Sequence, residues 1–186
     1  MVGCSRSAEP FRAAVPFRAV NRPGHPGYAP GLQRHHLIPR ELAQASAFAA
    51  LFSALGPART GLDDFCRNGL LLPATEQAAW RTRLPLHRGP HRQYTGLVRE
   101  RIGAIERDWA GQAAARSGIA AREAQFRLEL LQRALRRSLL RPAAERAPLN
   151  RLDPASAAVL FRELDAMADQ LWADTAQLAG ATLSRP

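Results

Sequence analysis

The chain has 186 residues, of which 46% are hydrophobic and 6% aromatic, and its formal net charge at pH 7 is +10. This length fits one domain with an added helical part, and the apolar fraction is large enough for a packed core, which excludes disorder of the whole chain. The low aromatic content argues against an all-β fold. No run of about 18 apolar residues is present, so we expect no membrane partner and a cytoplasmic location, unless a specialised system exports the protein.

All 26 basic residues are arginines. A GC-rich genome explains arginine in place of lysine, but it does not explain the excess over the 16 acidic residues. A net positive charge of this size attracts polyanions such as nucleic acid. The two cysteines, Cys4 and Cys66, form no C-x-x-C pair, which excludes a zinc ribbon or a thioredoxin-like site.

The first half of the chain is predicted to form two short strands with a helix between them. Prolines prevent a helix in residues 21–31, and residues 35–39 (HHLIP) are predicted to form a short strand. Residues 40–55 place apolar side chains at helical spacing, and Gly56 and Pro57 end this helix. Residues 68–73 (NGLLLP) follow with an Asn-Gly pair and a second apolar run, which predicts a second strand.

The second half of the chain is predicted to be helical. Pro90 suits the first position of a helix whose apolar stripe continues to residue 105, and residues 118–140 form an amphipathic pattern with a basic outer face. A last helix is expected at about 154–179. Residues 112–151 hold nine arginines and three acids, whereas residues 155–178 hold one arginine and four acids. This difference predicts an antiparallel helical hairpin between the two segments, with a dimer interface or a partner surface as the alternatives.

Four of the five histidines fall in two pairs, His35-His36 and His87-x-x-x-His91, and Asn68 lies between the pairs. Imidazole titrates near neutral pH and can take a proton from water. In its neutral form it also binds divalent transition metals. Adjacent residues on a strand point to opposite sides, so one histidine of the first pair can bind a metal while the other acts on the attacking water.

The order of these residues resembles the HNH nuclease superfamily with its ββα-metal finger, and most closely its AHH branch. The matching stretches are RHHLIP, NGLLLP and LHRGPHRQYTGLVRERI. The resemblance implies a small ββα-metal finger. The helix expected at 40–55 would be inserted between the strands of this finger, and with the expected C-terminal helical hairpin the fold class is α+β and mainly α. The resemblance also gives the division of the chain. It implies an N-terminal extension at 1–20, a nuclease domain at 21–110 and a helical region at 111–186.

The resemblance also implies roles for the site residues. His35 would be a metal ligand and His36 the general base. Asn68 would accept a hydrogen bond from the Nδ1–H group of His36 and leave the other ring nitrogen free for a proton, although Asn68 could also be a simple turn residue. His87, before the helix, and His91, in its first turn, would complete the metal site, with Gly89 as the turn between them.

Three histidine ligands leave open positions for water and phosphate oxygens. We therefore expect one divalent metal ion as cofactor, with zinc or nickel favoured by the ligand type and magnesium or manganese left open. Arginines flank the histidines directly and are candidates for binding phosphate, although a chain so rich in arginine could place them there by coincidence; they are Arg34, Arg40, Arg88 and Arg92. Tyr94 would be either a core residue or a substrate contact.

The expected function is a metal-dependent endonuclease that hydrolyses phosphodiester bonds, with DNA favoured over RNA as the substrate. The alternatives are a nucleic-acid-binding protein with a structural histidine metal site, and a helical interaction protein in which the histidines are incidental. AHH nucleases often form the toxin tips of longer proteins, so a toxin with an immunity or inhibitor protein as partner, a phage-derived protein and a housekeeping nuclease all stay open. The C-terminal helices could also form a homodimer.

Overall fold

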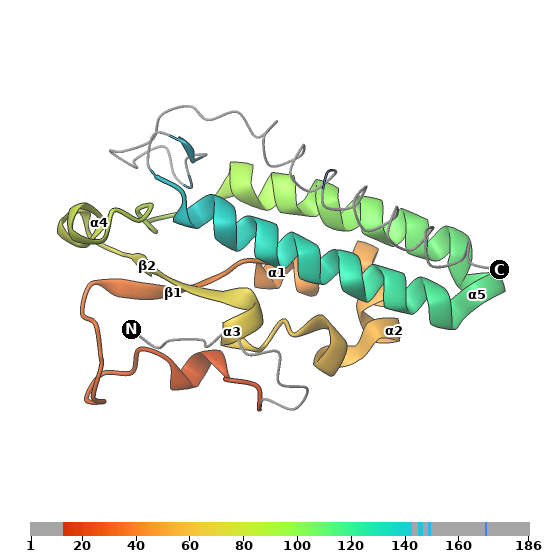
Figure 1. Cartoon of the computed structure of the whole chain (residues 1–186), viewed down its shortest axis with the longest axis horizontal. Helices are drawn as coiled ribbons and strands as arrows, with labels where there is room; N and C mark the ends of the chain where they lie inside the picture. Colours follow the sequence, from red (N-terminus) through yellow and green to blue (C-terminus); the bar gives the residue numbers. More distant parts are fainter. Residues whose placement is uncertain (1–12, 143–144, 147–148, 150–169, 171–186) are drawn as a thin grey trace, which may run out of the picture.

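The structure is a computed structural model of the chain, and it describes residues 13–142, 145–146, 149 and 170. The described part is mainly helical with one two-stranded antiparallel sheet, which confirms the expected α+β class (Figure 1). Its elements in chain order are the 3-10 helix η1 (Phe17–Ala19), strand β1 (Leu32–His36), helix α1 (Arg40–Ala43), the 3-10 helix η2 (Ser46–Phe48), helices α2 (Ala49–Thr60) and α3 (Phe65–Asn68), strand β2 (Gly69–Pro73), and helices α4 (Glu76–Thr82) and α5 (Arg92–Leu140).

The two strands pair with His35 opposite Leu70 and His36 opposite Gly69. Both predicted strands are present, but the first ends at His36 instead of extending to Pro39. Pro39 has φ −57° and ψ 140° and is the N-cap of α1, so the chain has already left the sheet where the helix begins. The two adjacent histidines thus occupy the last two positions of β1, where their side chains leave opposite faces of the strand.

The predicted insertion between the strands is confirmed, but it is not one helix. The chain leaves the helical path after Ala43 and continues as η2 and α2. Gly56, the predicted end of the helix, has φ 74° and forms a kink inside α2, which then continues to Thr60. A left-handed Gly61 ends α2, and α3 returns the chain to β2 with its first turn capped by the Asp64 side chain.

Helix α5 is a hairpin of two helical halves. Arg116, with φ −144° and ψ 50°, interrupts the helix, and the two halves lie side by side on the inserted helices (Figure 1). Asp108 on the first half forms an ion pair with Arg127 on the second. The helices predicted from residue 90 and over 118–140 therefore pair with each other. The hairpin predicted between 112–151 and 155–178 falls largely outside the described residues and stays a prediction.

The hydrophobic core lies between the sheet, α2 and both halves of α5. It contains fully buried side chains from each of these elements, including Leu37, Leu51, Leu72, Val98, Ile102 and Leu135. The end of β1 and the start of α5 are therefore anchored to one core, which gives the histidines they carry a defined spacing. Among the described residues, no helix is long and apolar enough to span a membrane.

Candidate metal centre

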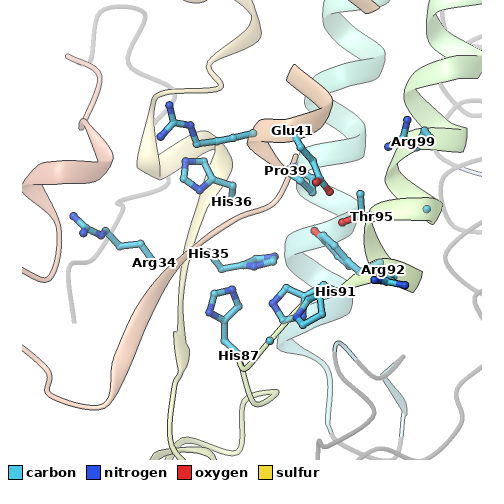
Figure 2. A pocket seen from close by; sticks show the side chains of 15 residues that line it. Arg34, His35, His36, Pro39, Glu41, His87, His91, Arg92, Thr95 and Arg99 are labelled. Atoms are coloured by element: carbon cyan, nitrogen blue, oxygen red, sulfur yellow. The ribbon is translucent and has the colours of Figure 1, made fainter. Parts of the chain in front are cut away.

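Three histidines from separate parts of the chain converge at the end of the sheet. His35 lies on β1, His87 follows α4, and His91 is the N-cap of α5. One ring nitrogen of each lies within 4.8 Å of the others, and the three rings point toward one another in Figure 2. Zinc–nitrogen bonds of about 2.1 Å place tetrahedral ligand atoms about 3.4 Å apart, so a small closure of the rings would complete a three-histidine site.

Local backbone contacts bring His87 and His91 to this place. The amide of His87 donates to the carbonyl of Pro73, 2.6 Å away at the end of β2. Gly89 has φ 77°, a left-handed conformation that favours glycine, so it provides the turn predicted between the two histidines. Helix α5 begins at Arg92 and not at Pro90. His91 therefore precedes the first turn instead of lying in it, and its carbonyl accepts from Thr95.

The hydrogen bonds of the rings fit a metal site. Nδ1 of His87 lies 3.1 Å from Oε1 of Gln33, and Nδ1 of His91 lies 3.1 Å from the carbonyl oxygen of Leu149. An Nδ1–H group that donates to these oxygens leaves Nε2 of each ring free as a ligand atom. Nε2 of His35 is buried, and no described residue forms a hydrogen bond with it. A buried polar atom without a partner is costly, and a metal ion at this position would satisfy it.

Burial keeps all three rings neutral at physiological pH. It lowers the pKa of His35 well below its usual value, and the charges of His87 and His91 lower it further. Burial, with His91, lowers the pKa of His87 to about 4. Burial also lowers the pKa of His91, against the opposing effect of its bond to Leu149. Neutral imidazole is the form that binds a metal, so the three rings are in the protonation state that metal binding requires.

His36 is half-buried and lies apart from the three-histidine cluster (Figure 2). Its ring stacks on Phe17, with the ring centroids 3.7 Å apart and the planes at 4°. Burial and the nearby Arg40 lower the pKa of His36, and Asp63 opposes them. The ring is therefore neutral at physiological pH and able to accept a proton.

Asn68 does not hold the His36 ring as predicted. Its Oδ1 accepts from the amide of Ile38 at 2.8 Å, and its Nδ2 donates to the carbonyls of Ile38 and Leu62 at 3.3 and 3.0 Å. In the described part of the chain no hydrogen bond joins Asn68 to His36. The amide instead joins the backbone after β1 to the backbone before α3, because Asn68 is buried between these two segments.

The three clustered histidines and the separate His36 line one cavity of about 610 Å³. His35, His87 and His91 line it together with His36, and so do Arg40, Arg92, Glu41 and Thr95. The cavity therefore combines three histidines that could hold a metal ion, a separate histidine and exposed guanidinium groups.

The sequence matches the model of a protein family described as a nuclease family of the HNH/ENDO VII superfamily with conserved AHH, and the match covers residues 16–135. The chain belongs to the AHH family. A search of curated proteins and a search of solved structures each found no match. Membership of a nuclease family indicates a nucleic acid substrate, and the HNH superfamily typically uses a divalent metal, which the cluster of three histidines could hold.

In this member of the AHH family, Arg34 stands where the family motif has alanine. Its Nη1 donates to the carbonyl of Phe17 at 2.9 Å, so this guanidinium holds the segment that covers His36. Of the four arginines predicted to bind phosphate, Arg34, Arg40 and Arg92 line the cavity, whereas Arg88 is not among its lining residues. Phosphate binding by these arginines stays a prediction.

Sequence reasoning missed Arg99, Gln33 and Phe17. Arg99 lines the cavity with Arg92, and their spacing of seven residues on a helix, which places both on one face, was a usable signal. Gln33 and Phe17 carry no such signal, because their contacts join segments far apart in the sequence. Tyr94 is a core residue: it is buried, its ring lies 5.2 Å from that of His35, and its hydroxyl donates to the carbonyl of Leu37.

Proposed function

We propose that the chain is a metal-dependent endonuclease that hydrolyses phosphodiester bonds, with DNA as its preferred substrate and His36 as the general base. One observation carries this proposal: the cavity shared by three histidines whose spacing could hold a metal ion is also lined by a fourth histidine that is not part of their cluster. A purely structural site normally closes with a fourth protein ligand. His36 does not fill that place, because its ring stacks on Phe17 instead.

The residues present account for the parts of a hydrolytic reaction. A divalent cation at His35, His87 and His91 would supply a Lewis acid that stabilises negative charge on the phosphate and the leaving oxygen. The neutral ring of His36 accepts a proton from water as the water oxygen attacks phosphorus. The bond between phosphorus and the leaving deoxyribose oxygen then breaks, and that oxygen takes up a proton from solvent water.

Guanidinium groups at the cavity would position the substrate. Arg40, Arg92 and Arg99 are exposed and line the cavity, and a guanidinium binds phosphate oxygens through two parallel hydrogen bonds. These contacts are to the backbone of a nucleic acid and carry no sequence information. The enzyme is therefore expected to cut with little sequence specificity, and its affinity for DNA should fall as salt rises.

The test is nicking of supercoiled plasmid DNA by the purified chain with magnesium, manganese, nickel or zinc, with and without EDTA. We expect metal-dependent nicking that His36→Ala lowers by about 10²–10⁴-fold without loss of metal binding, whereas His35→Ala removes the metal. His25→Ala is the matched control, because His25 is exposed in the loop before β1 and does not line the cavity. A protein that is inactive with all four metals would contradict the proposal, and cleavage of single-stranded RNA in preference to plasmid would revise its substrate.

A further inference from the structure

We propose that Phe17 is the positioning residue of the general base, and this inference rests on the proposed function of His36. The two rings are nearly parallel, with centroids 3.7 Å apart. No hydrogen bond from the described residues reaches the His36 ring. The hydrogen bond predicted between His36 and Asn68 is therefore replaced by a ring stack, which restricts the rotation of the imidazole.

Phe17 is itself held on two sides. The edge of its ring meets the ring of Phe65, with centroids 5.2 Å apart and planes at 76°. Its backbone carbonyl accepts a hydrogen bond at 2.9 Å from Arg34, the residue two places before His36 on β1. Because Arg34 is on the same strand as the general base, this bond connects the covering segment directly to the strand that carries His36.

The backbone before Phe17 is attached to α3. The amide of Phe65 donates to the carbonyl of Val15 at 2.7 Å, and the amide of Val15 donates to Oδ1 of Asp64 at 3.1 Å. Pro16 and Asp64 also form an isolated antiparallel bridge. These backbone contacts hold residues 15–17 beside the start of α3 and so fix the position of the Phe17 ring.

The Phe65 ring packs against strand β2 at Gly69. Gly69 lies opposite His36 in the sheet. A Cβ atom at Gly69 would lie 2.2–2.7 Å from three atoms of the Phe65 ring, so glycine at this position lets the Phe65 ring lie directly on the strand. His36, Phe17 and Phe65 therefore form one aromatic group, supported by the residue that pairs with the general base.

The consequence for catalysis is geometric. Displacement of a catalytic group by about 1 Å can cost on the order of 10²-fold in rate. Without the stack, the imidazole would rotate about its side-chain bonds, and only part of its population would present a nitrogen to the water. We expect loss of the stack to lower kcat and to leave KM and metal affinity unchanged, because Phe17 contacts none of the three histidines of the metal centre through a ring.

The test compares Phe17→Leu, which keeps an apolar side chain of similar size, with Phe17→Tyr, which keeps the stacking ring. We expect kcat for plasmid nicking to fall by about 10–100-fold in Phe17→Leu and to be retained in Phe17→Tyr. In a His36→Ala background, Phe17→Leu should have no further effect, since it acts through His36. Phe126→Leu is the control for loss of an aromatic ring, because Phe126 is outside the cavity.

A second measurement does not depend on activity. In the metal-free protein, the ring protons of His36 should be shifted upfield in NMR spectra by the current of the stacked Phe17 ring, and Phe17→Leu should remove this shift while Phe17→Tyr keeps it. If the chemical shifts of the His36 ring protons are the same in the wild type and in Phe17→Leu, Phe17 does not position the ring. An active Phe17→Leu variant, or one that loses equal activity with and without His36, would overturn its catalytic consequence. A wild-type protein that shows the NMR shift but never nicks DNA would instead overturn the proposed nuclease function.

Discussion

Replacing Asn68 by leucine separates two roles for this residue. The family resemblance implies a bond from Asn68 to the general base, whereas the structure shows an amide that bonds the backbone of Ile38 and Leu62. Leucine keeps the shape and approximate volume of the asparagine side chain, so it adds little cavity cost. It removes three hydrogen bonds at a residue that is only 1% exposed.

The size of the effect follows from the groups left behind. The amide and the carbonyl of Ile38 belong to a residue that is 1% exposed, and each costs about 1–3 kcal/mol when buried without a partner. The carbonyl of Leu62 is partly accessible to water and adds less. We therefore expect Asn68→Leu to lower the free energy of unfolding by about 3–5 kcal/mol, a large share of the total for a domain of this size.

Urea denaturation followed by circular dichroism measures this change. Gln132→Met is the matched control, because Gln132 is also buried but its side chain makes one hydrogen bond to the described residues, from Nε2 to the carbonyl of Thr60 at 3.1 Å. Its replacement should cost about 1–2 kcal/mol. The ratio of the two losses tests whether the structure assigns the bonds of Asn68 correctly.

One combination of stability and activity would contradict the assignment of the Asn68 amide to the backbone. If Asn68→Leu is within about 1 kcal/mol of the wild type and its kcat for nicking still falls by about 10²-fold or more, Asn68 acts on His36 and not on the backbone. Stability and kcat must therefore be measured on the same preparation, under conditions in which the variant is fully folded.

Three further predictions concern the metal centre and the strand beside it. Gln33→Ala should weaken metal binding by about 10–100-fold, because it removes the group that orients His87; calorimetry with zinc measures this, and unchanged affinity would show that the bond is dispensable. The metal-free protein should lose stability as pH falls from about 6.5 to 4, because the unfolded chain binds protons there that His87, with its pKa of about 4, does not; above 6.5 this contribution should be constant, and His87→Asn should flatten the profile. Gly69→Ala should destabilise the fold by about 1–3 kcal/mol through the clash with Phe65, and a neutral result in thermal melts would argue against that packing.

The short elements next to the histidines could be predicted because their signals are local. An apolar run after an Asn-Gly pair predicts a strand wherever it occurs, and β2 begins within one residue of the predicted position. Alternation along a strand predicts that His35 and His36 face opposite sides, and the structure shows the His35 ring in the three-histidine cluster and the His36 ring on Phe17. The errors lie at element ends: the helix predicted over 40–55 breaks after Ala43.

The partner of each polar side chain could not be predicted in the same way. The Asn68 amide bonds Ile38 and Leu62 because α3 packs against the end of β1. The expectation that an asparagine orients a histidine takes no account of that packing. The carbonyl that accepts from His91 belongs to Leu149, beyond the end of the hairpin. A backbone carbonyl has no residue-type signal, so only the fold identifies it.

The amino-acid sequence alone indicates the kind of chemistry this protein performs, through the order of its histidines, their likeness to the AHH family, the strand that turns His35 and His36 to opposite sides, and the net charge of +10. Those properties depend on residue type and on spacing within a few residues. The tertiary structure decided which atoms meet, namely Phe17 on His36, Gln33 on His87 and Asn68 on the backbone. Such contacts join segments that are distant along the chain, and the packing of α3, β2 and α5 on a common core brings them together.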